Sequence, residues 1–324
     1  MNRPTVFVAL QQFCESDDRP LRLLQEAGFD VRRNELGRRL KREEMLPLLQ
    51  EADAILAGVE PYDAQLLRSL SRLKVISRCG VGTDSIDLET AQKLKVAVFT
   101  TAEEVVEPVA QMTVGMILAL ARHFPQHLRD MGQGKWRKQT GFLLSEWTIG
   151  LVGFGRIGQA VGRYLQIFGP KILAADPRLH PEEVPAGITL CDLGKLLAES
   201  DLVSLHASRS KEEGPLLGHA ELFSMKPGSR LVNTARGYLV DERGLEEALS
   251  SGRLSAAALD VFEEEPYQGR LRDLPQVLCT PHVSTLTRAS RSAMEFSCAR
   301  NVLRFFNGKT DDPSRLVDKP PAAC

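Results

Sequence analysis

Short apolar runs alternate with amphipathic stretches along the first hundred residues. The apolar runs have the length and composition of strands and are TVFVAL (5–10), ADAILAG (52–58), LKVISRCG (73–80) and VAVFT (96–100). The stretches between them repeat apolar residues with helical spacing, at 21–28, 45–52, 64–70 and 89–95. Strands that alternate with helices in this way predict βαβ units and a parallel sheet.

A second alternating series follows a strongly apolar helix predicted over 109–124. This helix is apolar on more than one face, which favours burial between domains or subunits. Six further strands are predicted at 147–153, 171–176, 201–206, 230–235, 256–261 and 277–281. Helices are predicted at 157–168, 241–252 and, last, 289–308.

This order predicts two Rossmann-like α/β domains, each with a doubly wound parallel sheet, and a cleft between them. A chain of 324 residues is long enough for two such domains. We expect the last helix to return to the first domain. Residues 1–100 and 286–324 would then form one split domain, and residues 101–285 a second domain.

Composition narrows the classes of partner. The net charge of −1 gives no basic field for nucleic acid, and no apolar run approaches the roughly 20 residues of a membrane span. The six cysteines are scattered, without a C-x-x-C pair or a histidine cluster. We therefore expect no metal site and no disulfide framework, and a cytoplasmic location.

The stretch IGLVGFGRIG (149–158) contains Gly153-x-Gly155-x-x-Gly158 between a predicted strand and a predicted helix. Glycines in this context permit a tight turn, a close approach to a pyrophosphate and close helix–strand packing. Asp176 ends the next strand, where a carboxylate can accept hydrogen bonds from a ribose and repel a 2′-phosphate. NAD is therefore the predicted cofactor, although Arg178, two residues further on, leaves NADP possible. Residues 101–285 would then be the NAD-binding Rossmann domain, and the split domain, 1–100 with 286–324, the substrate-binding domain.

An arginine, a histidine and a glutamate could together serve the reduction of a carbonyl group. Arg236, in RLVNTARG (230–237), follows a predicted strand, and its guanidinium could hold a carboxylate and polarise a ketone. The alternative for this arginine alone is a solvated side chain at a strand end. His282 follows another strand in LCTPHVST (278–285), and histidine is a residue type suited to acid–base catalysis near neutral pH. His206 is a rival at a strand end, for which we expect a cofactor-lining or structural role.

The stretch LDVFEEEP (259–266) contains three glutamates that could orient the histidine. A carboxylate beside an imidazole fixes the ring and favours its charged form. Pro266 restricts the backbone of Glu265 to extended conformations. This restriction favours Glu265 slightly over Glu263 and Glu264.

Taken in order, GFGRIG, NTARG, LDVFEEEP and TPH resemble the D-isomer-specific 2-hydroxyacid dehydrogenase family. The resemblance covers nearly the whole chain and implies that Arg236, Glu265 and His282 are catalytic. It also implies that the loop Gly80-Val81-Gly82 binds the substrate carboxylate, and that the protein is a homodimer with the helix at 109–124 in its interface. The complete predicted cofactor site is Gly153, Gly155, Arg156, Ile157, Gly158, Asp176, His206, Thr234 and Asp260.

The substrate is expected to be a small 2-hydroxy or 2-oxo acid. Arg78 precedes the glycine loop at 80–82, as in phosphoglycerate dehydrogenase-like members of the family that this chain resembles, where an arginine at this position meets the distal phosphate. A guanidinium suits a phosphate, so we favour 3-phosphoglycerate slightly. A purely structural role for Arg78 is an equal alternative. The other functions to weigh are a glyoxylate or hydroxypyruvate reductase, and an NAD-sensing corepressor-like scaffold with little turnover.

Overall fold

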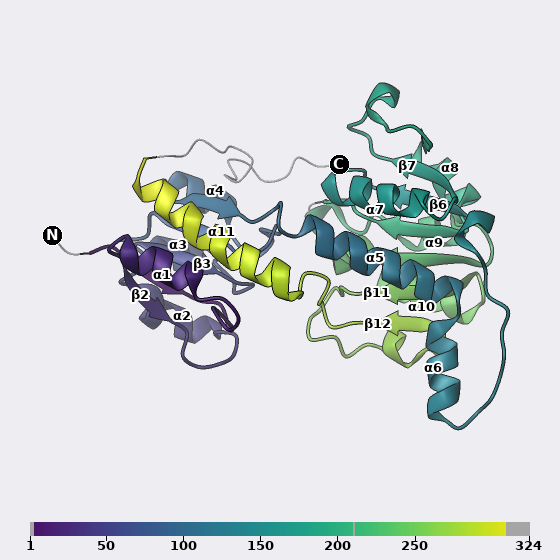
Figure 1. Ribbon diagram of the computed structural model, residues 1–324, viewed down its shortest axis with the longest axis horizontal. Helices are drawn as coiled ribbons and strands as arrows, with labels where there is room; N and C mark the ends of the chain where they lie inside the picture. The colour runs from purple at the N-terminus through teal and green to yellow at the C-terminus, as the bar shows by residue number, and fades with distance from the viewer. Residues whose placement is uncertain (1–2, 210, 309–324) are drawn as a thin grey trace. The chain divides into compact units, whose positions relative to one another are not determined.

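The computed structural model describes residues 3–209 and 211–308 (Figure 1). The chain divides into an N-terminal unit, Met1–Val105 with the segment that begins at Leu286, and a central unit that spans Val106–Thr285. Residues 309–324, the end of the segment predicted to return to the first domain, lie outside the described residues.

The N-terminal unit contains a five-stranded parallel sheet in the order β2-β1-β3-β4-β5. Its strands are β1 (Thr5–Val8), β2 (Asp30–Arg33), β3 (Ala54–Ala57), β4 (Val75–Arg78) and β5 (Ala97–Thr100). Its helices are α1 (Arg19–Glu26), α2 (Arg42–Leu49), α3 (Ala64–Ser69), α4 (Leu88–Lys93) and α11 (Arg288–Phe306). The order 2-1-3-4-5 is doubly wound, so the predicted fold class is confirmed for this unit.

The last helix, α11, packs on the N-terminal sheet through buried polar contacts as well as apolar ones. The Cys298 thiol donates to the Ser77 carbonyl over 3.4 Å, and the Asn301 amide donates to the Ser77 hydroxyl over 3.3 Å. The same amide donates to the Thr100 carbonyl over 3.4 Å. These bonds join α11 to the ends of β4 and β5, and Figure 1 shows α11 beside α1.

The central unit contains a seven-stranded parallel sheet in the order β12-β11-β10-β9-β6-β7-β8. Its strands are β6 (Thr148–Val152), β7 (Lys171–Ala175), β8 (Ile188–Leu190), β9 (Leu202–Leu205), β10 (Ser229–Asn233), β11 (Leu254–Leu259) and β12 (Val277–Cys279). Its helices are α5 (Val106–Ala121), α6 (Phe124–Gly132), α7 (Arg156–Gln166), α8 (Leu193–Glu199), α9 (His219–Ser224) and α10 (Glu242–Ser250).

Two apolar clusters cover the faces of the central sheet. Met116, Ile117 and Leu120 of α5 pack with Val161 and Leu165 of α7 in one cluster. The other cluster contains residues of α8, α9 and α10. The three layers confirm the second doubly wound domain, and they place α5 against the sheet of its own unit.

Two strands, β2 and β8, were not predicted. The sequence of β2, DVRR, is largely exposed, and no residue of β8 is fully buried. Both strands lie at a sheet edge, where only one neighbour is paired. Because most of their residues are exposed or only half-buried, these two strands leave no hydrophobic run in the sequence.

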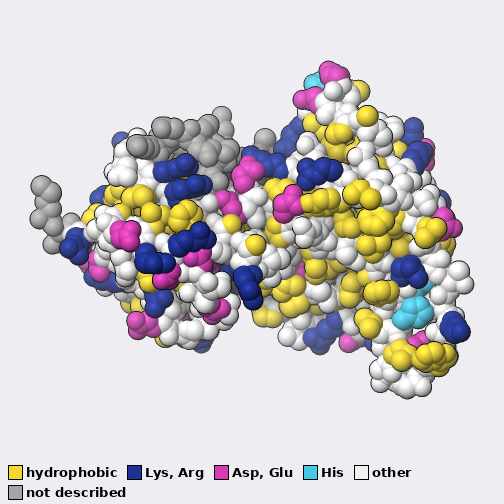
Figure 2. Space-filling model, in the orientation of Figure 1, with side chains coloured by type: hydrophobic (Ala, Val, Ile, Leu, Met, Phe, Trp, Pro, Cys, Tyr) yellow, Lys and Arg dark blue, Asp and Glu magenta, His cyan; other side chains and the backbone are white. Residues whose placement is uncertain are grey.

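Large apolar side chains are exposed on and after α6. Phe124 is 52% exposed, Leu128 67%, Met131 58% and Trp136 78%. Figure 2 shows apolar side chains on the surface in the region of α6. Such a patch is a typical interaction surface. Within residues 3–209 and 211–308, each helix is too short or too polar to cross a membrane.

Candidate active site

The glycine loop lies between β6 and α7, near the centre of the seven-stranded sheet. Gly153 has φ +84°, and a Cβ there would lie 2.5 Å from the Ala207 nitrogen. A Cβ on Gly158 would lie 2.4 Å from the Gly153 carbonyl oxygen. Glycine is therefore required at both positions, for backbone conformation at one and for close packing at the other.

Gly155 plays a different part in the loop. It is exposed, and a Cβ built on it would have no protein atom within 4 Å. The exposed Arg156 and half-buried Ile157 follow it in the first turn of α7, which spans 11 residues. Open space before a helix N-terminus fits a pyrophosphate, since backbone N–H groups and the helix dipole attract anions.

Asp176 fixes the glycine loop to the end of β7. Its carboxylate accepts hydrogen bonds from the Phe154 N–H over 2.9 Å and from the Arg178 N–H over 3.1 Å. The Arg178 side chain pairs with it over 3.3 Å. Burial raises the pKa of Asp176, but the Phe154 and Arg178 contacts outweigh it and hold the pKa below its usual value. The group is therefore a carboxylate near neutral pH.

His206 follows β9 beside the glycine loop. Its Nε2 lies 3.0 Å from the Ser204 hydroxyl, and its Nδ1 has no hydrogen-bond partner within the described part of the chain. Burial lowers the pKa of His206 to about 3. The ring is therefore neutral near pH 7.

The turn after β10 delivers Arg236. The buried Asn233 shapes this turn, because its side-chain oxygen accepts from the Ala235 N–H over 3.0 Å and its amide donates to the Arg236 carbonyl over 2.8 Å. Arg236 Nη1 donates to the Ala235 carbonyl over 2.7 Å. Asn233 was not among the residues predicted for the site, although an asparagine whose side chain accepts a hydrogen bond from the N–H two residues later is a known turn signal.

Gly237 brings the turn after β10 against the segment after β11. A Cβ on Gly237 would lie 1.8 Å from the Phe262 carbonyl carbon. The role of this glycine is therefore the close approach of two backbones. The approach holds Arg236 beside the segment that carries Glu265.

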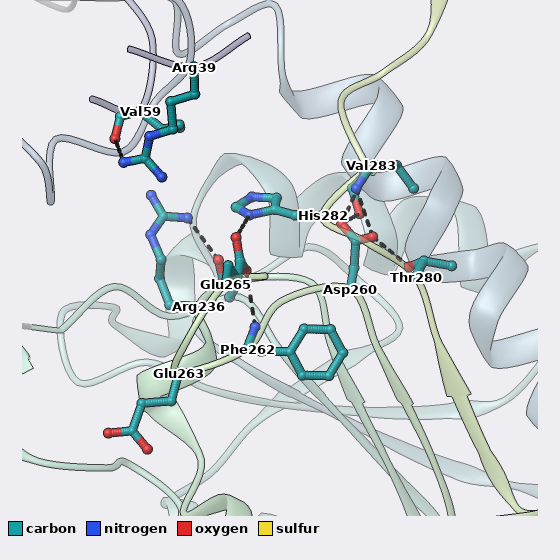
Figure 3. A network of polar contacts seen from close by, with 12 residues as sticks. Arg39, Val59, Arg236, Asp260, Phe262, Glu263, Glu265, Thr280, His282 and Val283 are labelled. Atoms are coloured by element: carbon teal, nitrogen blue, oxygen red, sulfur yellow. Dashed lines mark hydrogen bonds and ion pairs between the residues drawn. The ribbon is translucent and has the colours of Figure 1, made fainter. Parts of the chain in front are cut away.

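Glu265 and His282 form a direct contact (Figure 3). Glu265 Oε2 lies 2.8 Å from His282 Nδ1, and Glu265 Oε1 accepts from the Phe262 N–H over 3.1 Å. Burial raises the pKa of Glu265, but His282, Phe262 and the charge of Arg236 together hold it below its usual value. Of the other two glutamates, Glu263 points away from His282 in Figure 3.

Asp260 anchors the loop that carries His282. Its fully buried carboxylate accepts from the Thr280 hydroxyl over 2.5 Å, from the Val283 and Ser284 N–H groups over 2.9 Å each, and from the Ser284 hydroxyl. His282 itself has φ +53°, a left-handed conformation that a loop held at both ends can maintain. The side chain of Asp260, predicted to contact the cofactor, thus makes its bonds within the loop.

Thr234 also uses its side chain inside the protein. The Thr234 hydroxyl lies 2.8 Å from the Thr113 hydroxyl. The Thr113 hydroxyl in turn donates to the Val109 carbonyl on α5 over 2.8 Å. This contact joins the end of β10 to α5. The predicted cofactor contact of Thr234 stays a prediction.

The four residues predicted to bind substrate lie in the N-terminal unit, in and before the loop after β4. Arg78 Nε donates to the Gly82 carbonyl over 3.1 Å, and its Nη1 donates to the Cys79 carbonyl. Gly80 has φ +139°, and its N–H donates to the Thr101 hydroxyl over 2.7 Å. Val81 is 43% exposed. Arg78 thus folds over its own loop and shapes it.

Arg236, Glu265 and His282 therefore follow β10, β11 and β12, three adjacent parallel strands whose carboxyl ends lie at one edge of the sheet. The glycine loop follows β6 at the same edge. The family sequence model for the NAD binding domain of D-isomer specific 2-hydroxyacid dehydrogenases matches residues 114–284. The chain belongs to the D-isomer specific 2-hydroxyacid dehydrogenase family. The resemblance seen in the sequence is thereby confirmed, as is the expectation of an NAD-dependent oxidoreductase.

Relatives within the family differ in the acid that they are named for. The chain is 36% identical to a glyoxylate reductase of Thermococcus litoralis over 287 residues, which cover 85% of this chain and 86% of that protein. It is 34% identical to a D-3-phosphoglycerate dehydrogenase of Methanocaldococcus jannaschii over 297 residues, 89% of this chain and 56% of that protein.

The fold also matches a solved family member. The crystal structure of D-lactate dehydrogenase from Aquifex aeolicus, with NAD and lactic acid, superposes with a TM-score of 0.84 at 26% identity. The match covers 98% of this chain and 99% of that one. The two parallel-sheet units of the chain are thus a family fold.

Proposed function

We propose that this dehydrogenase interconverts a D-2-hydroxy acid and the corresponding 2-oxo acid, with His282 as the acid–base residue. The contact between Glu265 Oε2 and His282 Nδ1 at 2.8 Å carries the proposal. An imidazole paired with a carboxylate, at the sheet edge that also carries the glycine loop, is the arrangement that proton transfer to a carbonyl oxygen requires.

The pair assigns a nitrogen to each task. Since Glu265 is ionised near neutral pH, the Nδ1–H group of His282 donates a hydrogen bond to its carboxylate, and Nε2 is left to face the reacting oxygen. When protonated, Nε2 gives its proton to the carbonyl oxygen during reduction; when unprotonated, it takes a proton from the hydroxyl during oxidation. Glu265 keeps the ring oriented and stabilises its charged form.

Arg236 supplies the positive charge that the substrate needs. Its charge reaches Glu265, as the lowered pKa of that group indicates. A guanidinium can bind the carboxylate of the substrate and polarise the carbonyl oxygen beside it.

The central unit would hold NAD at the glycine loop. The open space at Gly155 and the first turn of α7 suit the pyrophosphate, and the ionised Asp176 disfavours a 2′-phosphate. When bound, NAD accepts or supplies the hydride at the carbon that bears the oxygen. The N-terminal unit, with the loop Gly80–Gly82, would bind the acid.

We further propose that the enzyme is a homodimer of the cytoplasm. The exposed apolar residues Phe124, Leu128 and Met131 begin where α5 ends and support a covered surface there. Light scattering after gel filtration tests this: a Leu128→Asp, Met131→Asp variant should elute as a monomer. The five described cysteines are free thiols, as suits a reducing compartment.

A panel of 2-oxo acids with NADH or NADPH, followed by absorbance, tests the reaction class. The panel includes phosphohydroxypyruvate, the oxo acid of 3-phosphoglycerate, because the expectation for Arg78 concerns a phosphate. His282→Ala should lower kcat roughly 10²- to 10⁴-fold while NADH still binds. His180→Ala, which removes an exposed histidine of the same unit, is the matched control.

Near-normal turnover by His282→Ala would contradict the role of this residue. A wild-type protein that binds NADH tightly but turns over none of the acids would instead favour the scaffold function.

A further inference from the structure

A buried acid lies at the carboxyl edge of the five-stranded sheet. Glu60 is in the loop after β3 and is 2% exposed. Its Oε2 has no hydrogen-bond partner within the described residues, and burial raises its pKa. A buried carboxyl oxygen without a partner costs free energy, so it calls for a ligand or another function.

A second buried polar group lies near it. Tyr62 is fully buried, and its hydroxyl also has no hydrogen-bond partner within the described residues. Burial and the charge of Glu60 raise the pKa of Tyr62 well above its usual value. The carboxyl group and the hydroxyl therefore share one electrostatic environment.

Two arginines of the same unit contribute positive charge to this environment. Arg39 and Arg78 oppose the effect of burial on the pKa of Glu60. Arg39 donates to the Val59 carbonyl, directly before Glu60 (Figure 3). Arg78 is the residue that shapes the loop Gly80–Gly82. The cluster thus combines an acceptor with two guanidinium groups.

The backbone close to Glu60 pairs with the segment that follows the predicted substrate loop. The Tyr62 N–H donates to the Ser85 carbonyl over 2.7 Å, and the Asp87 N–H donates to the Tyr62 carbonyl over 3.0 Å. The loop after β3 therefore runs beside the loop after β4. In parallel α/β sheets, this carboxyl edge is where ligands bind.

Gly58 leaves the room that the carboxyl group occupies. A Cβ at this position would lie 2.6 Å from Glu60 Oε2 and 3.1 Å from Oε1. The loop is therefore built around an inward-facing carboxyl group rather than a side chain that could turn to solvent.

We infer that Glu60 is a specificity-determining residue that accepts a hydrogen bond from a hydroxyl group of the substrate. The inference rests on the proposed function and names the class of acid: a 2-oxo acid with a hydroxyl group on the next carbon. Its hydroxyl group suits the buried Glu60 Oε2, which has no hydrogen-bond partner within the described residues. A phosphate in place of that hydroxyl would bring negative charge against the Glu60 carboxylate and would be rejected.

The test compares kcat/KM for hydroxypyruvate, pyruvate and phosphohydroxypyruvate with NADH. Pyruvate lacks only the hydroxyl group. The wild-type enzyme should prefer hydroxypyruvate to pyruvate by about 10- to 100-fold, the effect of one hydrogen bond to a charged group. Glu60→Leu should reduce this preference to about threefold or less, because the acceptor is gone.

Glu60→Gln keeps the size of the side chain, so it tests the charge even where Glu60→Leu fails to fold. It should raise kcat/KM for phosphohydroxypyruvate relative to hydroxypyruvate by about tenfold, since the repulsion between like charges is removed. Glu43→Gln, an exposed glutamate of the same unit, is the matched control and should change neither ratio.

Unchanged ratios in both Glu60 variants, with turnover retained, would overturn this inference alone and leave Glu60 a structural residue. A wild-type preference for phosphohydroxypyruvate would also overturn it. If the wild-type enzyme turned over no 2-oxo acid, the proposed function would fail, and this inference with it.

Discussion

Gly237→Ala should disable the active site without touching a catalytic side chain. A methyl group on residue 237 would lie 1.8 Å from the Phe262 carbonyl carbon, 2.1 Å from its oxygen and 2.3 Å from the Glu263 nitrogen. All three atoms belong to the backbone, so no side-chain rotation can relieve the overlap. Since contacts this short do not occur in packed proteins, the two backbones must separate by about 1 Å or more.

The expected cost has two parts. Overpacking of this kind lowers the free energy of unfolding by about 1–3 kcal/mol. The separation also moves Arg236 away from Glu265, and a displacement of about 1 Å at a reacting centre lowers the rate about 100-fold. That factor corresponds to about 2.7 kcal/mol in the activation free energy.

Three measurements separate these effects. NADH absorbance gives kcat/KM for the best 2-oxo acid, thermal unfolding gives the stability, and NADH fluorescence shows whether the cofactor still binds. Gly132→Ala is the control, because a Cβ there meets no atom within 4 Å. If Gly237→Ala kept kcat/KM within twofold of wild type with an unchanged melting temperature, the role assigned to this close approach would be wrong.

Three further predictions concern carboxylates of the central unit. The pKa of Glu265 is held below its ordinary value of 4.5, so the carboxylate contributes to stability above pH 4.5, and this contribution is lost as the pH falls through the folded-state pKa. The melting temperatures of wild type and Glu265→Gln should therefore differ most near pH 7 and converge in acid. A difference in melting temperature that did not change with pH would argue against the ion pair. Asp176→Ser should raise the ratio of NADPH-linked to NADH-linked kcat/KM about tenfold or more, because the charge that repels a 2′-phosphate is removed; an unaltered ratio would exclude Asp176 from cofactor choice. Asp260→Asn turns one acceptor oxygen into a donor that faces N–H and hydroxyl donors. The free energy of unfolding, measured by urea denaturation, should fall by about 1–3 kcal/mol, and kcat should fall as well. A variant with the wild-type free energy of unfolding and the wild-type kcat would show that the loop does not depend on this carboxylate.

Much of the fold was predictable because its signals are local. Buried parallel strands leave continuous apolar runs, and the runs near β1, β6 and β10 were recognised for that reason. The strands β2 and β8 are partly exposed and leave no such run, so they were found only in the structure, whereas the better buried edge strand β5 was recognised.

The candidate site was predictable in residue type but not in arrangement. Two strand-end histidines and three consecutive glutamates were open to interpretation, and the resemblance to a family favoured His282 and Glu265. Burial and partners provide the physical reason, because His206 is held neutral while His282 contacts Glu265. Asn233 and Glu60 were not recognised, since no motif marks a residue whose importance lies in what surrounds it.

By itself, the sequence determined the alternation of strands and helices, the glycine loop and the family, since these depend on residues close together in the chain. Tertiary structure alone decided which carboxylate meets which imidazole, and which glycine allows two backbones to touch. Those outcomes depend on distances between residues 17 or more positions apart, and only the packing of the sheet sets such distances.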